Sequence, residues 1–356
     1  MGAYTTINDP SAYFKVHLYT GNGSANHAQT FSDTDTDMQP DLVWIKNRDA
    51  TDGHCLFDAV GGATNLIRMD NTDAESDDDD TLDSFTSDGF QVDDDDKVNT
   101  NTEKYVAWCW KANGTGSSNT NGSINTTATS ANTTAGFSIN TYTGTGSAAT
   151  IGHGLGKVPT LIISIKRSAT KAPLVYSPFM GNDYEMYMDR TTAASAAAAT
   201  WNSTDPTSTV WSVATDSNNT SSATQVAYVF TDIQGYSKFA EYKGNGNIDS
   251  AFIYTGFRPA LVIIKRYSGA GDGWMMFDNK REGFNAADGA AIGNNWIPAD
   301  DTTAESANNL VDFCANGFKV RSTHGGLNGN SGQTYLYMAW GESPLVNSNG
   351  VPGNAR

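Results

Sequence analysis

The stretch Pro259-Ala-Leu-Val-Ile-Ile-Lys-Arg266 decides the fold of this chain. A short apolar run rich in β-branched residues, opened by a proline and closed by basic residues, predicts a buried strand. Two similar stretches occur earlier in the chain, Pro40-Asp-Leu-Val-Trp-Ile-Lys-Asn-Arg48 and Pro159-Thr-Leu-Ile-Ile-Ser-Ile-Lys-Arg167. Because the same strand occurs three times, we expect a whole structural unit to be repeated.

Three further features recur in the same order around this strand. An aromatic strand that ends in a Gly-x-Gly turn precedes it, a short apolar strand follows it, and an aromatic strand closes each copy. The first closing strand is Tyr105-Val-Ala-Trp-Cys-Trp110, and its alternate residues are apolar on both faces. This pattern indicates burial between two sheets rather than one wet face.

The predicted fold is all-β, with three tandem jelly-roll-like β-sandwich repeats. Their boundaries are residues 1–112, 136–234 and 235–343, and a polar tail follows over 344–356. The tail is expected to lie along a neighbouring surface or to stay mobile. No insert separates the second and third copies, so we expect those two to pack closely as a rigid pair.

The segment 113–135, between the first and second copies, is rich in Gly, Ser, Thr and Asn. Its one large apolar residue is Ile124, so it cannot bury a core of its own. This composition predicts either a linker or an extended surface strap.

The charge balance excludes two classes of partner. The formal net charge is −17, with 22 Lys plus Arg against 39 Asp plus Glu. A general nucleic-acid binder needs an excess of cations to displace phosphate counterions, and so does a protein that binds anionic membranes. No segment approaches the roughly 18 consecutive apolar residues of a membrane span, so membrane insertion is not expected.

Acidic runs are the first candidates for chemistry: Asp33-Thr-Asp-Thr-Asp37, and the runs of four at 77–80 and 93–96. The first run resembles a calcium loop, but Met38 stands at the glycine position and Trp44 at the bidentate glutamate position. Three interpretations remain open for these runs: solvated loops, a bound calcium ion, or a catalytic pair. We therefore expect no cofactor, with calcium as the one alternative.

The other reactive residue types give no recognisable constellation. The cysteines do not recur between the copies, which indicates core residues, and no two histidines have metal-ligand spacing. Gly152-His-Gly-Leu-Gly-Lys157 ends like a phosphate loop but lacks its first glycine and its closing Ser or Thr. We therefore assign no catalytic and no metal-binding residue, expect no enzymatic activity, and identify no ligand-binding residue. The residues concerned are Cys55, Cys109 and Cys314, and His17, His27, His54, His153 and His324.

Basic residues close each proline-led strand and are the most regular charged feature of the chain. Two interpretations are open: they pair with local carboxylates such as Asp58 and Asp278, or they face a ligand. The residues are Lys46 and Arg48, Lys166 and Arg167, and Lys265 and Arg266.

Several phrases together resemble a family of tailed-bacteriophage virion proteins, many of them from marine and cyanobacterial hosts. Besides the proline-led strands, these phrases are Tyr19-Thr-Gly-Asn-Gly-Ser24, Tyr254-Thr-Gly-Phe-Arg-Pro-Ala260, Phe277-Asp-Asn-Lys-Arg281 and Tyr337-Met-Ala-Trp-Gly-Glu-Ser-Pro344. The resemblance covers about residues 13–356 and implies concanavalin-like β-sandwich domains in a tail-fibre or minor structural protein. It supplies no catalytic residues.

The expected function is that of a structural protein on the outside of a phage virion, of tail-fibre or receptor-binding type, with host-surface glycans as a candidate contact. One alternative is a capsid decoration protein or a neck and tail scaffold protein, because the polar strap and tail could lie over neighbouring proteins. Another alternative is a polysaccharide depolymerase. The expected partners are other virion proteins and further copies of the chain, a trimer above all. The expected location is the virion surface after assembly in the host cytoplasm.

Overall fold

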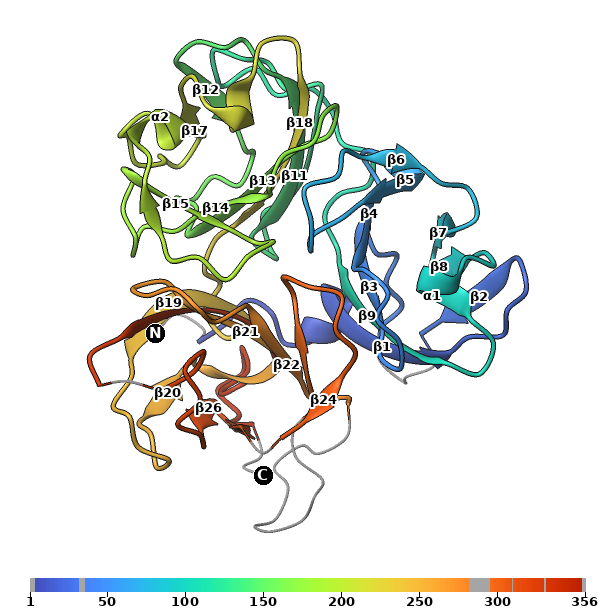
Figure 1. Ribbon diagram of the computed structural model, residues 1–356, viewed down its shortest axis with the longest axis vertical. Helices are drawn as coiled ribbons and strands as arrows, with labels where there is room; N and C mark the ends of the chain where they lie inside the picture. The colour runs from blue at the N-terminus through green and yellow to red at the C-terminus, as the bar shows by residue number, and fades with distance from the viewer. Residues whose placement is uncertain (1–3, 32–35, 282–294, 309, 330, 354–356) are drawn as a thin grey trace.

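The computed structural model describes residues 4–31, 36–281, 295–308, 310–329 and 331–353. Its regular structure is almost entirely antiparallel strand, and its two α-helices, α1 (Asp96–Asn99) and α2 (Ala198–Trp201), have four residues each. The predicted all-β class is confirmed. Figure 1 shows the strands gathered into three groups around a common centre.

Three large sheets share one strand order. We call the units built on them module 1 (residues 14–110), module 2 (128–230) and module 3 (237–344). In module 1 the order is β1 (Phe14–Thr20), β9 (Lys104–Trp110), β3 (Leu42–Asn47), β4 (Cys55–Asp58), β5 (Gly62–Ile67) and β6 (Ser76–Asp77). In module 3 it is β19 (Ser237–Lys243), β27 (Thr334–Pro344), β21 (Phe257–Arg266), β22 (Met275–Asp278), β23 (Asn295–Pro298) and β24 (Ser306–Ala307).

The sheet of module 2 follows the same order with one extra edge strand. It runs β10 (Ala128–Asn132), β11 (Phe137–Thr143), β18 (Thr224–Phe230), β13 (Leu161–Lys166), β14 (Leu174–Tyr176), β15 (Tyr184–Tyr187) and β16 (Ser195–Ala196). In all three sheets the proline-led strand pairs with the closing strand, which pairs in turn with the opening strand.

A small second sheet covers one face of each large sheet, which gives the two layers of a sandwich. In module 1 it is β2 (His27–Thr30), β8 (Gly89–Val92) and β7 (Leu82–Thr86), and in module 2 it is β12 (Ala149–Gly152) with β17 (Val210–Val213). In module 3 it is β20 (Phe252–Tyr254), β26 (Gly317–Val320) and β25 (Val311–Cys314). A separate apolar cluster fills each sandwich.

The opposite faces of the three large sheets meet in a fourth apolar cluster at the centre of the molecule. In β3, Val43 and Ile45 point into the sandwich of module 1, whereas Leu42 and Trp44 belong to the central cluster. Successive side chains of a strand point to opposite faces, so a strand buried on both faces must be apolar throughout. The continuous apolar runs of the proline-led strands therefore reflect two cores, one on each side.

Aromatic rings from the three closing strands, β9, β18 and β27, meet at the centre of the molecule. Trp340 lies 5.3 Å from Trp110 and 5.5 Å from Phe230 between ring centroids, both in edge-to-face geometry. The cavity that remains among these residues measures about 20 Å³, so packing there is nearly complete. Module 1 therefore joins the same core, so the close packing expected of the second and third copies extends to the first.

A buried asparagine recurs at the outer end of each module. The side-chain Oδ1 atoms of Asn99, Asn219 and Asn328 each accept the backbone N–H of the middle residue of a Gly-x-Gly turn, at 2.7 to 2.8 Å. The carbonyl of the residue before each asparagine accepts a tyrosine hydroxyl from the opening strand. The same polar network thus anchors the same turn in all three modules.

Two polar segments pack on the chain itself. Residues 128–132 of the segment predicted as linker or strap form β10 and pair with β11, and Ile124 is buried in the module 2 sandwich and bridges to Ile151. Module 2 therefore begins before the predicted boundary at residue 136. In the tail, Ser348 exchanges two hydrogen bonds of 2.7 Å with Asn8, so this part lies against the N-terminal segment of the same chain.

Candidate ligand-binding site

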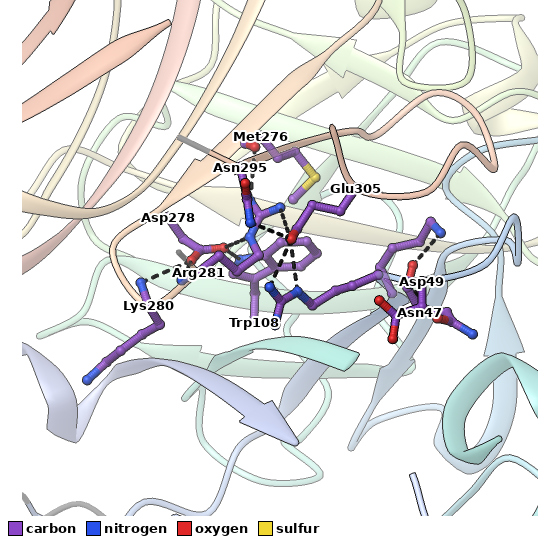
Figure 2. Close-up of polar contacts among 11 residues, drawn as sticks. Asn47, Asp49, Trp108, Met276, Asp278, Lys280, Arg281, Asn295 and Glu305 are labelled. Atoms are coloured by element: carbon purple, nitrogen blue, oxygen red, sulfur yellow. Dashed lines mark hydrogen bonds and ion pairs between the residues drawn. The ribbon is translucent and has the colours of Figure 1, made fainter. Parts of the chain in front are cut away.

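Arg48, which follows the proline-led strand of module 1, forms a two-pronged ion pair with Glu305 of module 3. Its Nε and Nη2 atoms lie 2.9 and 2.8 Å from the two carboxylate oxygens, and the Glu305 N–H donates to the Arg48 carbonyl at 3.0 Å. We call this contact between modules 1 and 3 the first junction (Figure 2). Both side chains are about nine-tenths buried.

The first junction continues into a buried network within module 3. Glu305 also accepts from Arg281 at 3.2 Å, and Arg281 pairs with Asp278 at 2.6 Å. The indole N–H of Trp108, from module 1, donates to Asp278 at 3.1 Å, and the Arg281 guanidinium lies over the Trp108 ring (Figure 2). The side chains of Arg281 and Asp278 are fully buried, so their charges serve the contact between modules and not a ligand.

The second junction, between modules 2 and 1, repeats this geometry. Arg167 forms a two-pronged pair with Glu75, whose N–H donates to the Arg167 carbonyl at 2.9 Å. The hydroxyl of Tyr228, which takes the place of Trp108, donates to Asp58 at 2.8 Å. Two of the three contacts around the centre are therefore closed by an arginine–glutamate pair and a buried aspartate.

The third junction, between modules 3 and 2, lacks these side chains. The N–H groups of Arg48, Arg167 and Tyr267 donate to the carbonyls of the first residues of β9, β18 and β27, so Tyr267 occupies the arginine position. Ala194 occupies the glutamate position, because its N–H donates to the Tyr267 carbonyl at 3.0 Å. A tyrosine and an alanine cannot form an ion pair. This junction is closed instead by hydrogen bonds to backbone carbonyls, among them those of the Trp274 indole N–H to Tyr187 at 2.9 Å and of the Lys265 ammonium to Arg190 at 3.3 Å.

A cavity of about 340 Å³ opens at the third junction. The Tyr267 hydroxyl donates to the carboxylate of Glu241 in β19, and Tyr184 exposes 44% of its surface and Phe179 41%. Burial, and then the hydrogen bond to Glu241, raise the pKa of the Tyr267 hydroxyl well above its ordinary value, so it remains a donor. The cavity is lined by Met180, Tyr184, Ala193, Ala194, Tyr267 and Ser268.

The prediction that the recurring basic residues pair with carboxylates holds for the arginines, but with other partners than expected. Arg266 pairs with Asp272 at 2.6 Å. The partner of Asp278 is Arg281, and the ammonium groups of Lys46 and Lys265 donate to backbone carbonyls. Burial lowers the pKa of both lysines to about 8.

The acidic runs 77–80 and 93–96 lie side by side, because the Asp95 N–H donates to the Asp80 carbonyl at 2.9 Å. Lys97 binds Asp95 at 2.7 Å and approaches Asp78 at 3.9 Å, which relieves part of the repulsion. In the described ranges, no three histidine, cysteine or acidic side chains come together as metal ligands. Asp33 and Asp35 of the third run lie outside the described residues.

Two cysteines and one histidine occupy buried structural positions, whereas Cys314 is partly exposed and does not fit the prediction of a core residue. Cys55 and Cys109 are buried, and burial raises the pKa of both thiols above the ordinary value. His54 lies at the first junction: its Nδ1 accepts from Trp44 at 2.8 Å and its Nε2 donates to the Pro298 carbonyl at 2.8 Å. Burial lowers the pKa of His54 to about 4, so its ring is neutral near pH 7.

Sequence reasoning missed the third junction, although a signal was present. Arg48, Arg167 and Tyr267 each lie eight residues after the proline that opens their strand. Matching the basic residues by type aligned Arg266 with Arg167, whereas counting from the proline would have singled out Tyr267. Ala194 lies 35 residues after Pro159, as Glu75 lies 35 residues after Pro40, whereas Glu305 lies 46 residues after Pro259. The same count therefore places Ala194 at the glutamate position of module 2, but the longer stretch in module 3 hides the repeat.

Comparison with known proteins gives one match. A family model described as a domain of unknown function (DUF7483) matches residues 9–344. No curated protein and no solved structure matches the chain. None of the helices in the described residues is long and apolar enough to cross a membrane.

Proposed function

Because the chain belongs to the DUF7483 family, which assigns no activity, we propose its role from its own residues: a non-catalytic structural protein on the outside of a tailed-phage particle, of fibre or receptor-binding type. The sequence resemblance to virion proteins supports this role. The observation that carries it is the closed ring of three modules, in which the recurring charged side chains are used to join the modules to one another.

Such a body suits an external component that must keep its shape. Three sandwiches share one central core and are joined by buried ion pairs, which makes relative motion of the modules costly. The decoration alternative drew on a polar strap and tail that could reach neighbouring proteins. In the structure, β10 contacts module 2 and Ser348 contacts the N-terminal segment of the same chain. The argument that the strap and tail reach neighbouring proteins, and with it the decoration alternative, is therefore weaker.

The test has two measurements. Quantitative mass spectrometry and antibody labelling of intact particles should place the chain at the tail or fibre in low copy number, whereas roughly hundreds of copies over the capsid would indicate decoration instead. Purified protein added before infection should compete with particles and reduce adsorption to host cells. Absence of the chain from purified particles would contradict the proposal.

A further inference from the structure

We propose that the cavity at the third junction is a binding site for a neutral sugar residue of a glycan. This inference rests on the proposed function and gives it a site and a ligand class. The cavity lies within the volume range of small-molecule sites, at about 340 Å³, and at the boundary between two modules, where such sites often occur.

The departure from the repeated pattern supports a site at this place. At the other two junctions a guanidinium and a carboxylate fill the equivalent position. At the third, Tyr267 and Ala194 replace that pair, Ser177 replaces the buried aspartate beside the proline-led strand, and Met338 replaces the aromatic donor. These four substitutions remove the charges that close the other two junctions, and two of the four residues, Tyr267 and Ala194, line the cavity.

The lining has the chemistry that a sugar ring requires. Tyr184 in the lining presents partly exposed aromatic surface, on which the C–H face of a pyranose can stack, and Phe179, also partly exposed, precedes the lining residue Met180. The Tyr267 and Ser268 hydroxyls and the Glu241 carboxylate supply hydrogen-bonding groups for sugar hydroxyls. Each of these oxygens already takes part in a hydrogen bond within the chain and retains acceptor capacity, so sugar hydroxyls can donate to it.

The charge of the site selects against acidic sugars. The Glu241 carboxylate accepts from the lining residue Tyr267, and the guanidinium of Arg190 in module 2 is engaged by Asp189 and lies over the Tyr187 ring. The chain as a whole carries −17. A uronate or sulfate group would meet repulsion at this site, so the ligand class is neutral.

Titration of the full chain with oligosaccharides tests the proposal. The probes are neutral gluco-, galacto-, manno- and N-acetylglucosamine oligomers, with polygalacturonate and sulfated oligomers as acidic comparisons, followed by calorimetry. At least one neutral oligomer should bind, and the acidic ones should not. Tyr184→Ala should weaken that binding roughly tenfold, and Tyr184→Phe should preserve it. Phe252→Ala, an exposed aromatic on β20, is the matched control and should bind as the wild type does.

A second variant fills the site with the ion pair that closes the other two junctions. The double change Tyr267→Arg with Ala194→Glu introduces the pair found at the other junctions and should abolish binding without lowering the melting temperature. Binding by this variant at wild-type strength would overturn the proposal, and so would the failure of every neutral oligomer at millimolar concentration. If the double variant misfolds, the binding affinities of Tyr184→Ala and Tyr184→Phe still test the site, and equal affinities would overturn the proposal.

The two proposals can fail separately. If the protein reduces phage adsorption and its Tyr184→Ala variant does so equally, the sugar site is wrong while the virion role stands. If neutral oligomers bind at the third junction but the chain is absent from particles, the site stands and the virion role is wrong.

Discussion

At the residue scale, the side chains that matter most are buried polar ones, both where modules meet and within each module. His54 is held neutral between the Trp44 indole N–H and the Pro298 carbonyl, and Asn99, Asn219 and Asn328 each satisfy a Gly-x-Gly turn. Buried polar groups of this kind are costly unless every partner is present, so they fix one arrangement of the surrounding backbone.

Stability should fall when the pH drops below about 6.5, because His54 must remain unprotonated in the folded protein. Its folded pKa is about 4 and its ordinary value 6.5, so the unfolded chain takes up the proton first and is favoured between these pH values. The contribution is about 3 kcal/mol, lost progressively from pH 6.5 down to 4. Urea denaturation of wild type and His54→Gln at pH 7 and pH 5 measures it.

The glutamine variant keeps an acceptor for Trp44 and a donor for Pro298 but does not titrate, so its loss of stability between the two pH values should be smaller. Burial also lowers the pKa of His153, which contributes in the same direction and stays constant in the comparison. Equal pH dependence of wild type and variant would contradict a neutral buried His54.

Residue type alone could not predict these roles. The recurring asparagines escape a search for repeated motifs, because their neighbours differ: Val98-Asn99, Asn218-Asn219 and Leu327-Asn328. In an Asn-rich chain, one more asparagine carries no signal until the turn that it anchors is known. The arginines gave a clearer signal, but their partners Glu75 and Glu305 lie in loops whose spacing from the strands varies.

At the element scale, the proline-led strands were predictable because burial on both faces of the sheet requires apolar residues at successive positions. A strand between two cores must be apolar on both faces, and β3 and β21 meet that demand from Leu42 to Ile45 and from Leu261 to Ile264. The edge strand β10 was not predictable, because an edge strand that lies over polar surface needs few apolar residues. Its sequence resembles a linker for that reason.

The strap should contribute to the stability of module 2 through Ile124. This residue is buried among the apolar side chains of the module 2 sandwich, so Ile124→Ala should cost about 2–3 kcal/mol of unfolding free energy. Thr120→Ala, at a polar position of the same segment, should change stability by less than about 0.5 kcal/mol. Chemical denaturation of both variants decides, and an unaffected Ile124→Ala protein would show that the segment behaves as a linker.

At the scale of the whole molecule, the three sandwiches depend on one another. The central cluster takes side chains from all three large sheets, and Trp110, Phe230 and Trp340 meet in it. The module boundaries could be estimated from the sequence repeats. The ring arrangement could not be predicted, because a repeated sequence does not indicate which sheet faces of its copies pack against one another. The predicted homotrimer remains a prediction.

Thermal unfolding should therefore occur in one cooperative transition. A module that separated from the others would expose its half of the central cluster, so partial unfolding is strongly disfavoured. Scanning calorimetry should give a calorimetric enthalpy equal to the van't Hoff enthalpy. Trp340→Ala should lower the single midpoint and should not split the transition, whereas two or three resolved transitions would contradict a shared core.

Joining the three modules in one polypeptide also frees them from strict symmetry. In a ring of identical subunits, any substitution at one contact appears at every contact, so a cavity gained at one place would cost the ring all of its ion pairs. Here Tyr267 and Ala194 alter a single contact while Arg48 and Arg167 continue to hold the other two. Covalent linkage lets one corner of the molecule specialise while the remaining corners preserve the shape.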